Sequence, residues 1–75
     1  MLLERVVSLN PKQRGRFVRT ARVRMGFTQQ QMARWLGMST ARLGKIERGE
    51  LDLWIHELFE FCLLVGMRSL RRRPR

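Results

Sequence analysis

Closely spaced helix-start and helix-stop signals divide residues 10–49 into three segments. Each segment begins at a short polar side chain that can accept the free backbone N–H groups of a first helical turn, and each ends at a glycine, which suits the left-handed backbone of a helix end. Two starts, Asn10 with Gln13 and Thr28 with Gln31, have the reciprocal pattern of a capping box. The starts are Asn10, Thr28 and Ser39, and the stops are Gly26, Gly37 and Gly49. This region can therefore form only short helices joined by tight turns.

Hydrophobic periodicity agrees with these signals and predicts helices over about residues 11–25, 28–36 and 40–48. In the first helix, the expected buried face carries Phe17, Val18, Ala21 and Met25, and the opposite face carries Lys12, Arg16 and Arg19. Residues 1–9 form an apolar extension whose pattern fits a helix and a strand equally well. The structure of this extension stays open.

A last helix is expected over about residues 53–65, with Asp52 as its cap and Gly66 as its end. At helical spacing, its core-facing residues are Trp54, Ile55, Leu58, Phe61, Cys62 and Val65. The apolar residues outside that arc are Phe59, Leu63 and Leu64. Because a helix that is apolar on most sides is usually buried on more than one, we expect these three residues to form a dimer or partner interface.

Size and composition exclude several classes of protein. A chain of 75 residues forms one small domain, which is smaller than most metabolic enzymes. A single cysteine cannot form an internal disulfide, and Cys62 with a lone His56 cannot furnish a four-ligand zinc site. The longest uncharged apolar run is far short of the roughly 20 residues that span a bilayer. We expect no enzymatic activity, no metal, no cofactor, no membrane insertion, and a reducing cytoplasm as the location.

Charge is both large and unevenly distributed along the chain. Lys and Arg number 16 against 6 Asp and Glu, a net charge of +10, and fourteen of the 16 are Arg, whose planar guanidinium suits phosphate groups and guanine edges. From Lys12 to Arg48, ten basic residues accompany one acid, Glu47, whereas residues 50–66 hold four acids and no Lys or Arg. One part of the molecule should therefore bind a polyanion such as nucleic acid.

The two short helices after Thr28 have the geometry of a helix-turn-helix. The second, from Thr40 to Arg48, begins with small residues, which allow a close approach to base edges in a major groove. Its long donors are Arg42 and Lys45. Thr28 and Gln29 begin the first helix, where backbone N–H groups and a partial positive charge suit a phosphate.

Residues at fixed spacing over positions 22–49 strengthen this interpretation; they are Arg22, Gly26, Phe27, Thr28, Gln29, Met32, Ala33, Leu36, Gly37, Met38, Ser39, Leu43, Ile46, Glu47 and Gly49. The pattern resembles the phage-repressor/Cro-like (Xre) helix-turn-helix family, and the resemblance covers residues 14–67. It implies a lambda-repressor-like, all-α compact bundle of four to five short helices that has no cofactor and binds a two-fold symmetric operator in double-stranded DNA as a homodimer. We accordingly expect the N-terminal extension over 1–9, a Cro/C1-type DNA-binding domain over 10–67 and a basic tail over 68–75.

The resemblance also implies a role for individual positions. Base-facing positions are Thr40, Ala41 and Lys45, and positions that touch the sugar-phosphate backbone are Gln29, Ser39 and Arg48. Arg42 and Gly44 lie beside them. Arg22 and Glu47 match a pair that forms an internal ion pair in the family.

Three parts of the sequence depart from the family pattern. The turn Glu50-Leu51-Asp52 is acidic where a basic turn commonly rests on phosphate, so it should repel DNA. Gly44 replaces a hydroxyl or amide residue, and it either permits close approach to DNA or is merely tolerated. Leu53-Trp54 replaces the Pro-Ser start of the last helix.

These observations together predict a dimeric, sequence-specific repressor that acts on its own promoter in a phage, plasmid or other mobile element, in the bacterial cytoplasm or nucleoid or in a phage-infected cell. One alternative is an antitoxin whose main task is to bind a toxin protein through the last helix, with DNA binding secondary. Another is a basic chain that binds RNA or an anionic membrane surface without sequence preference. The pair of short capped helices argues against that last alternative.

Overall fold

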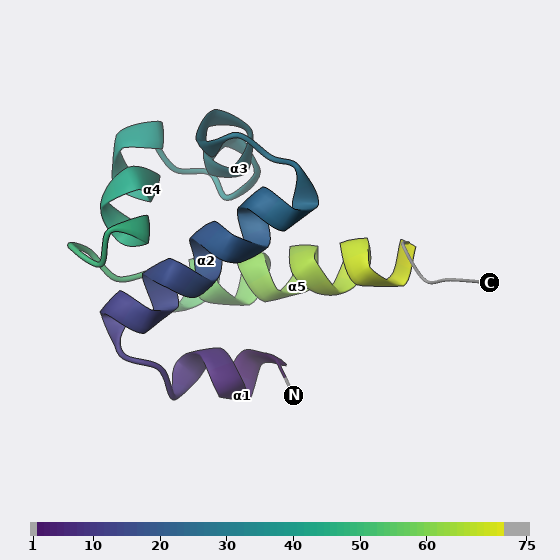
Figure 1. Ribbon diagram of the computed structural model, residues 1–75, viewed down its shortest axis with the longest axis horizontal. Helices are drawn as coiled ribbons and strands as arrows, with labels where there is room; N and C mark the ends of the chain where they lie inside the picture. The colour runs from purple at the N-terminus through teal and green to yellow at the C-terminus, as the bar shows by residue number, and fades with distance from the viewer. Residues whose placement is uncertain (1, 72–75) are drawn as a thin grey trace.

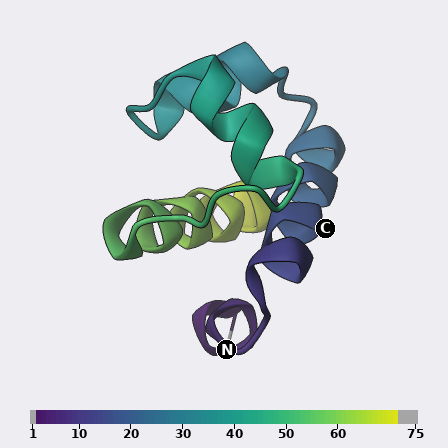
Figure 2. The same ribbon diagram turned by 90° about the vertical axis from the view of Figure 1, so that its left-hand side faces the viewer.

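The computed structural model describes residues 2–71, which form five helices and no strand within that range. These helices are α1 (Leu2–Val7), α2 (Pro11–Met25), α3 (Gln29–Trp35), α4 (Thr40–Glu47) and α5 (Ile55–Arg71). Helices α3 and α4 lie on one side of α2 and α1 lies on the other, while the long α5 crosses beside α2 (Figures 1 and 2). The predicted all-α class is confirmed.

The predicted helix ends of α2, α3 and α4 are confirmed by their caps. The Asn10 side chain accepts a hydrogen bond from the Gln13 backbone N–H while the Gln13 side chain accepts one from the Asn10 N–H, and Thr28 and Gln31 repeat this capping box. Ser39 Oγ accepts from the Arg42 N–H at 3.1 Å. The three glycines that follow, Gly26, Gly37 and Gly49, have φ of 81°, 68° and 81°.

The core lies between α2, α3, α4 and α5. Its buried members are Val18, Met32, Ala33, Leu36, Leu43, Phe61 and Leu64. Phe17 packs edge-on against Phe61, with ring centroids 5.9 Å apart. Phe17, Ala21 and Met25 lie against the core and Val18 lies inside it, which confirms the predicted buried face of α2.

Helices α2 and α4 cross at Gly15. A Cβ at this position would collide with the carbonyl oxygen of Ile46 and would lie 3.1 Å from that of Glu47. Because the obstructing atoms belong to the backbone of α4, they cannot move aside as the end of a side chain could. Gly15 therefore sets the distance between α2 and the second helix of the helix-turn-helix.

Helix α5 differs from the prediction at both ends. Trp54, not Asp52, occupies the cap position: its N–H donates to Glu57 Oε1 at 2.7 Å and its carbonyl accepts from the Leu58 N–H. The helix also continues through Gly66 to Arg71. One reason is that Arg68 Nη2 donates to the Met25 carbonyl while its guanidinium lies 5.0 Å from the Phe27 ring centre, so the extra turn is anchored to the end of α2.

The buried face of α5 is also rotated relative to the prediction. Leu58, Phe61 and Leu64 are buried, whereas Trp54 and Ile55 are 63% and 74% exposed. The predicted core placement of Trp54 and Ile55 is therefore wrong, because the core begins only one turn into the helix. Leu64 belongs to the core and is not available to a partner, which corrects its place in the expected interface; Phe59 and Leu63 are exposed.

Residues 2–7 of the N-terminal extension form a helix, which decides between the two structures left open. Val6 is buried, and α1 packs on both α2 and α5. Arg14 Nη1 donates to the carbonyls of Val6, Val7 and Leu9 at the end of α1. The expected basic tail is divided, since residues 68–71 continue α5 and residues 72–75 lie outside the described range.

Candidate nucleic-acid interface

Helix α4 presents a polar face next to the turn that joins it to α3. Leu43 and Ile46 point into the protein and are buried, so the helix is held in place by its apolar side. The exposed residues at its start, on its face and at its end are Ser39, Thr40, Ala41, Lys45 and Arg48. Every sequence-predicted base-facing residue therefore lies on the solvent side of α4.

A buried ion pair fixes α4 relative to α2. Arg22 Nε lies 2.7 Å from Glu47 Oε2, and Arg22 Nη1 donates to the Phe27 carbonyl at 2.8 Å. The amide of Gln29 donates to the other Glu47 oxygen at 3.0 Å. Since Glu47 is only 8% exposed, this arrangement joins α2, the start of α3 and the end of α4 into one unit. One N–H of Gln29, expected to meet phosphate, is thus directed to Glu47.

Arg42, for which we expected a DNA contact, directs its guanidinium to the start of α5 instead. Its Nε and Nη2 atoms donate to Glu57 at 3.1 and 2.9 Å, and the guanidinium carbon lies 5.7 Å from the centre of the Trp54 ring. Glu57 was not among the residues predicted for the site. The spacing Trp54-x-x-Glu57 is the signal that could have found it, because a Glu three residues after a cap accepts from the cap N–H.

The carboxylate of Glu57 is ionised despite its burial. Burial alone would raise the pKa of Glu57, but hydrogen bonds from Arg42 and from the Trp54 N–H, with the charges of Arg42 and His56, bring this pKa below its ordinary value. The negative charge therefore persists at the first turn of α5, where its interaction with the helix dipole is stabilising. Glu57 holds the start of α4 against the start of α5.

The acidic turn after α4 is neutralised within the protein. Glu50 pairs with Arg48 at 2.9 Å and Asp52 pairs with Arg14 at 2.7 Å. Hydrogen bonds from these arginines hold the pKa of each carboxyl below its usual value. The repulsion of DNA expected from this turn is therefore reduced, since each acid has a guanidinium beside it.

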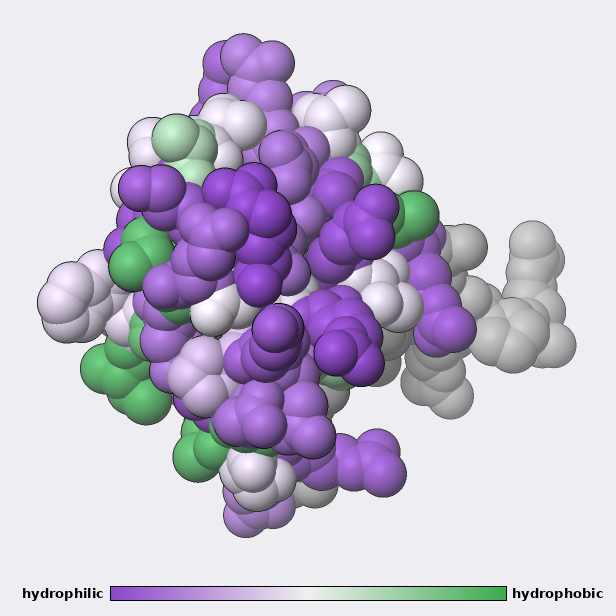
Figure 3. All heavy atoms as spheres, turned by 60° about the vertical axis from the view of Figure 1, so that its left-hand side comes forward, coloured by the Kyte–Doolittle hydropathy of each residue, from purple (hydrophilic) through white to green (hydrophobic). Residues whose placement is uncertain are grey.

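Exposed basic residues lie on α4 and on α2 and α3, the two helices that pack against it. They are Lys12, Arg16, Arg19 and Arg24 on α2, Arg34 on α3 and Lys45 on α4, and Arg48 follows directly after α4. Figure 3 brings forward the side of the molecule where α4 and the start of α2 lie, and hydrophilic residues dominate it, with hydrophobic ones at its edges. Such a surface can bind a polyanion through many weak phosphate contacts.

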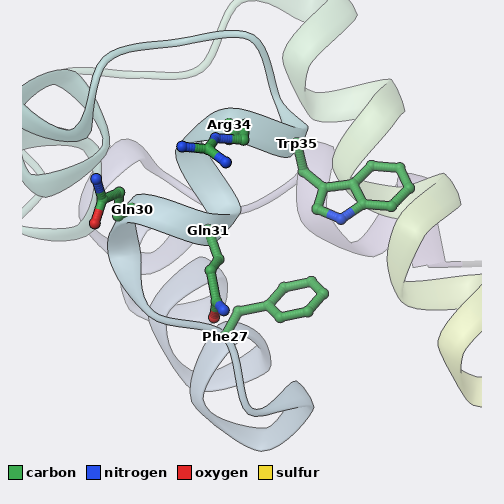
Figure 4. Close-up of a pocket in the computed structure, with 5 residues that line it drawn as sticks. All are labelled: Phe27, Gln30, Gln31, Arg34 and Trp35. Carbon is green, nitrogen blue, oxygen red and sulfur yellow. The ribbon is translucent and has the colours of Figure 1, made fainter.

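A surface hollow lies beside α3 and is lined by Phe27, Gln30, Gln31, Arg34 and Trp35. The rings of Phe27 and Trp35 flank it, with Gln31 next to Phe27 and Gln30 directed away (Figure 4). Its lining contains no acid, cysteine or histidine. Among residues 2–71, no three His, Cys, Asp or Glu side chains are grouped as a metal site, and none of the helices described is both long and apolar enough to cross a bilayer.

A comparison with known protein families identifies the domain to which these features belong. A family model described as a helix-turn-helix domain matches residues 13–61, which extend from α2 into the first half of α5. The match includes both helices of the α3–α4 pair and the residues that fix them. Searches of curated proteins and of solved structures found no match to the chain.

Proposed function

Because this chain belongs to the helix-turn-helix domain family, we propose that it is a sequence-specific DNA-binding transcriptional regulator, a homodimeric repressor of its own promoter in a phage, plasmid or other mobile element. The observation that carries this proposal is the solvent face of α4, which is polar and begins with small residues, together with the exposed basic residues on α4 and on the two helices packed against it. A bacterial cytoplasm or nucleoid, or a phage-infected cell, is where such a protein meets its promoter.

In this mechanism α4 enters the major groove. Thr40, Ala41 and Lys45 face the base edges, and Ser39 at the start of α4 contacts the backbone. Exposed basic residues of α2, namely Lys12, Arg16 and Arg19, add phosphate contacts that supply affinity without sequence preference. A repressor bound at a promoter prevents polymerase from occupying it.

An exposed apolar ridge on α5 supports the dimer. Ile55, Phe59, Leu63 and Met67 recur every four residues and are 50–74% exposed. Trp35, 59% exposed, lies beside Leu63 and Met67 across a shared hollow. Ridges with this spacing pack well against the same ridge on another helix, so a second copy is the occupant we propose. A toxin protein on the same ridge is the alternative.

The first test is fluorescence anisotropy on DNA from immediately upstream of the gene and on a scrambled duplex of equal composition, each at two salt concentrations. We expect a preference of about a thousandfold or more for the upstream DNA, which phosphate contacts alone cannot supply. Lys45→Ala should cost about 1–3 kcal/mol on that DNA and less on the scrambled duplex. Equal, steeply salt-dependent binding of the wild-type protein to both duplexes would contradict autoregulation.

A further inference from the structure

A notch interrupts the solvent face of α4. Thr40, Gly44 and Arg48 are spaced four residues apart and so lie in one row along the helix. Gly44 has no side chain, so the row has a gap at its middle, and Gly44 is buried there because the side chains of Arg48 and Gln29 lie over it. The family resemblance leaves the notch unexplained and places Arg48 against the DNA backbone.

The guanidinium of Arg48 lies over this notch. A Cβ at position 44 would lie 3.3 Å from Arg48 Nη1 and 3.9 Å from Gln29 Nε2. Helical side chains lean toward the N-terminus of their helix, so Arg48, although it follows the last residue of α4, carries its charged group back to the middle of the exposed face. Residues in the first part of a recognition helix are the ones that reach base edges, and the Arg48 guanidinium is brought toward them.

Glu50 pairs with that guanidinium at the surface. Arg48 Nε lies 2.9 Å from Glu50 Oε2 and Nη2 lies 3.5 Å from Oε1. This pair uses the edge formed by Nε and Nη2, which leaves the Nη1–Nη2 edge with two parallel N–H groups. An adjacent carboxylate offsets the positive charge, which weakens attraction to a phosphate, but it leaves the planar pair of donors intact.

We propose that Arg48 is a specificity-determining residue that reads a guanine through its Nη1–Nη2 edge, with Glu50 as the positioning residue that holds it. Guanine presents two acceptors, O6 and N7, at a spacing that matches two guanidinium N–H groups. The inference rests on the proposed DNA-binding function and adds to it the base that one position of the operator must contain. Gly44 provides the room in which the guanidinium lies.

The test is selection of bound duplexes from a randomised DNA library by the full chain, followed by affinity measurements on the selected site and its single-base variants. We compare wild type with Arg48→Lys, which keeps the charge but lacks the planar fork, and with Arg5→Lys on α1 as the matched control. Arg48→Lys should lose about 5- to 150-fold of the preference for guanine at one position of each half-site, with the other positions unchanged. Arg5→Lys should select the wild-type site.

Glu50→Gln supplies an independent readout. Without the carboxylate, the positive charge of Arg48 is no longer offset and its guanidinium loses its orientation. Binding to scrambled DNA should therefore strengthen and become more salt-dependent, while the guanine preference falls. Arg48→Lys and Glu50→Gln proteins that select the wild-type site with undiminished guanine preference would overturn the role of Arg48 and leave the proposed function standing. A wild-type protein that enriches no sequence would refute both. Thermal melting of each variant verifies that it is folded.

Discussion

Arginine side chains in this protein bind the ends of helices, in addition to making the surface positive. Arg14 donates to the carbonyls at the end of α1, Arg68 donates to the Met25 carbonyl at the end of α2, and Arg42 binds the carboxylate at the start of α5. A guanidinium can do this because it carries five donors in a fixed plane. The high arginine content therefore serves the assembly of a small helical domain as well as the attraction of a polyanion.

Replacing Glu57 tests one of these contacts. Glu57→Gln keeps the shape of the side chain and an acceptor for the Trp54 N–H but loses the charge that binds Arg42. We expect the free energy of unfolding to fall by about 1.5–3 kcal/mol, the range for hydrogen bonds to charged groups, as measured by urea denaturation. Glu60→Gln on the exposed side of the same helix should change it by less than about 0.5 kcal/mol. Equal effects of the two substitutions would contradict a structural role for Glu57.

The lowered pKa values of Glu57 and Asp52 predict loss of stability in acid. Because each carboxyl has a lower pKa in the folded state, the unfolded chain binds more protons as the pH falls below the ordinary values of about 4.3 and 3.9. The urea midpoint should therefore be constant above about pH 5.5 and decrease as the pH is lowered from there through the folded-state pKa values. Glu57→Gln should make that decrease shallower; an unchanged slope would show that Glu57 does not contribute.

At the scale of helices, the close crossing of α2 and α4 can be tested with two glycines. Gly15→Ala should destabilise the protein by at least about 2 kcal/mol, because the added methyl group collides with backbone atoms of α4. Gly66→Ala is the matched control: no atom lies within 4 Å of its Cβ, so the better helix propensity of alanine should stabilise α5 by about 0.5–1 kcal/mol. Opposite changes in melting temperature are expected, and a stabilised Gly15→Ala protein would contradict the crossing.

The ends of a helix could be predicted when the residues that determine them are close in the sequence, and not when those residues are far apart. The ends of α2, α3 and α4 are fixed by side chains within four residues, such as Thr28 and Gln31, so the sequence contains the whole signal. The end of α5 depends on Arg68, whose partner Met25 lies 43 residues away in the chain. The partner of Arg42 could not be identified for the same reason, since charge alone does not say which of the four acids of residues 50–66 will lie nearby. The Arg22–Glu47 pair was predicted from the family resemblance, and it agrees with Glu47 being the one acid among the ten basic residues from Lys12 to Arg48.

At the scale of the whole molecule, two surfaces have different chemistry. The face of α4 is polar, and exposed basic residues lie on α4 and on the two helices packed against it, whereas the ridge of α5 with Trp35 is apolar. A small domain that exposes a contiguous apolar ridge usually covers it with a partner. Two copies joined through this ridge would present two α4 helices, as a two-fold symmetric operator requires.

Leu63→Glu tests this assembly, because it places a charge in the middle of the ridge at a side chain that is 52% exposed and outside the core. Wild-type protein should sediment at twice the 9.0 kDa mass of the chain, and the variant should sediment as a folded monomer. Val23→Glu, which changes an exposed apolar residue on α2, should remain dimeric. The variant should also lose affinity for a site with two half-sites about 10 base pairs apart, but not for a single half-site. A monomeric wild-type protein would contradict the homodimer and would leave the ridge to a different protein, as the toxin-binding alternative requires.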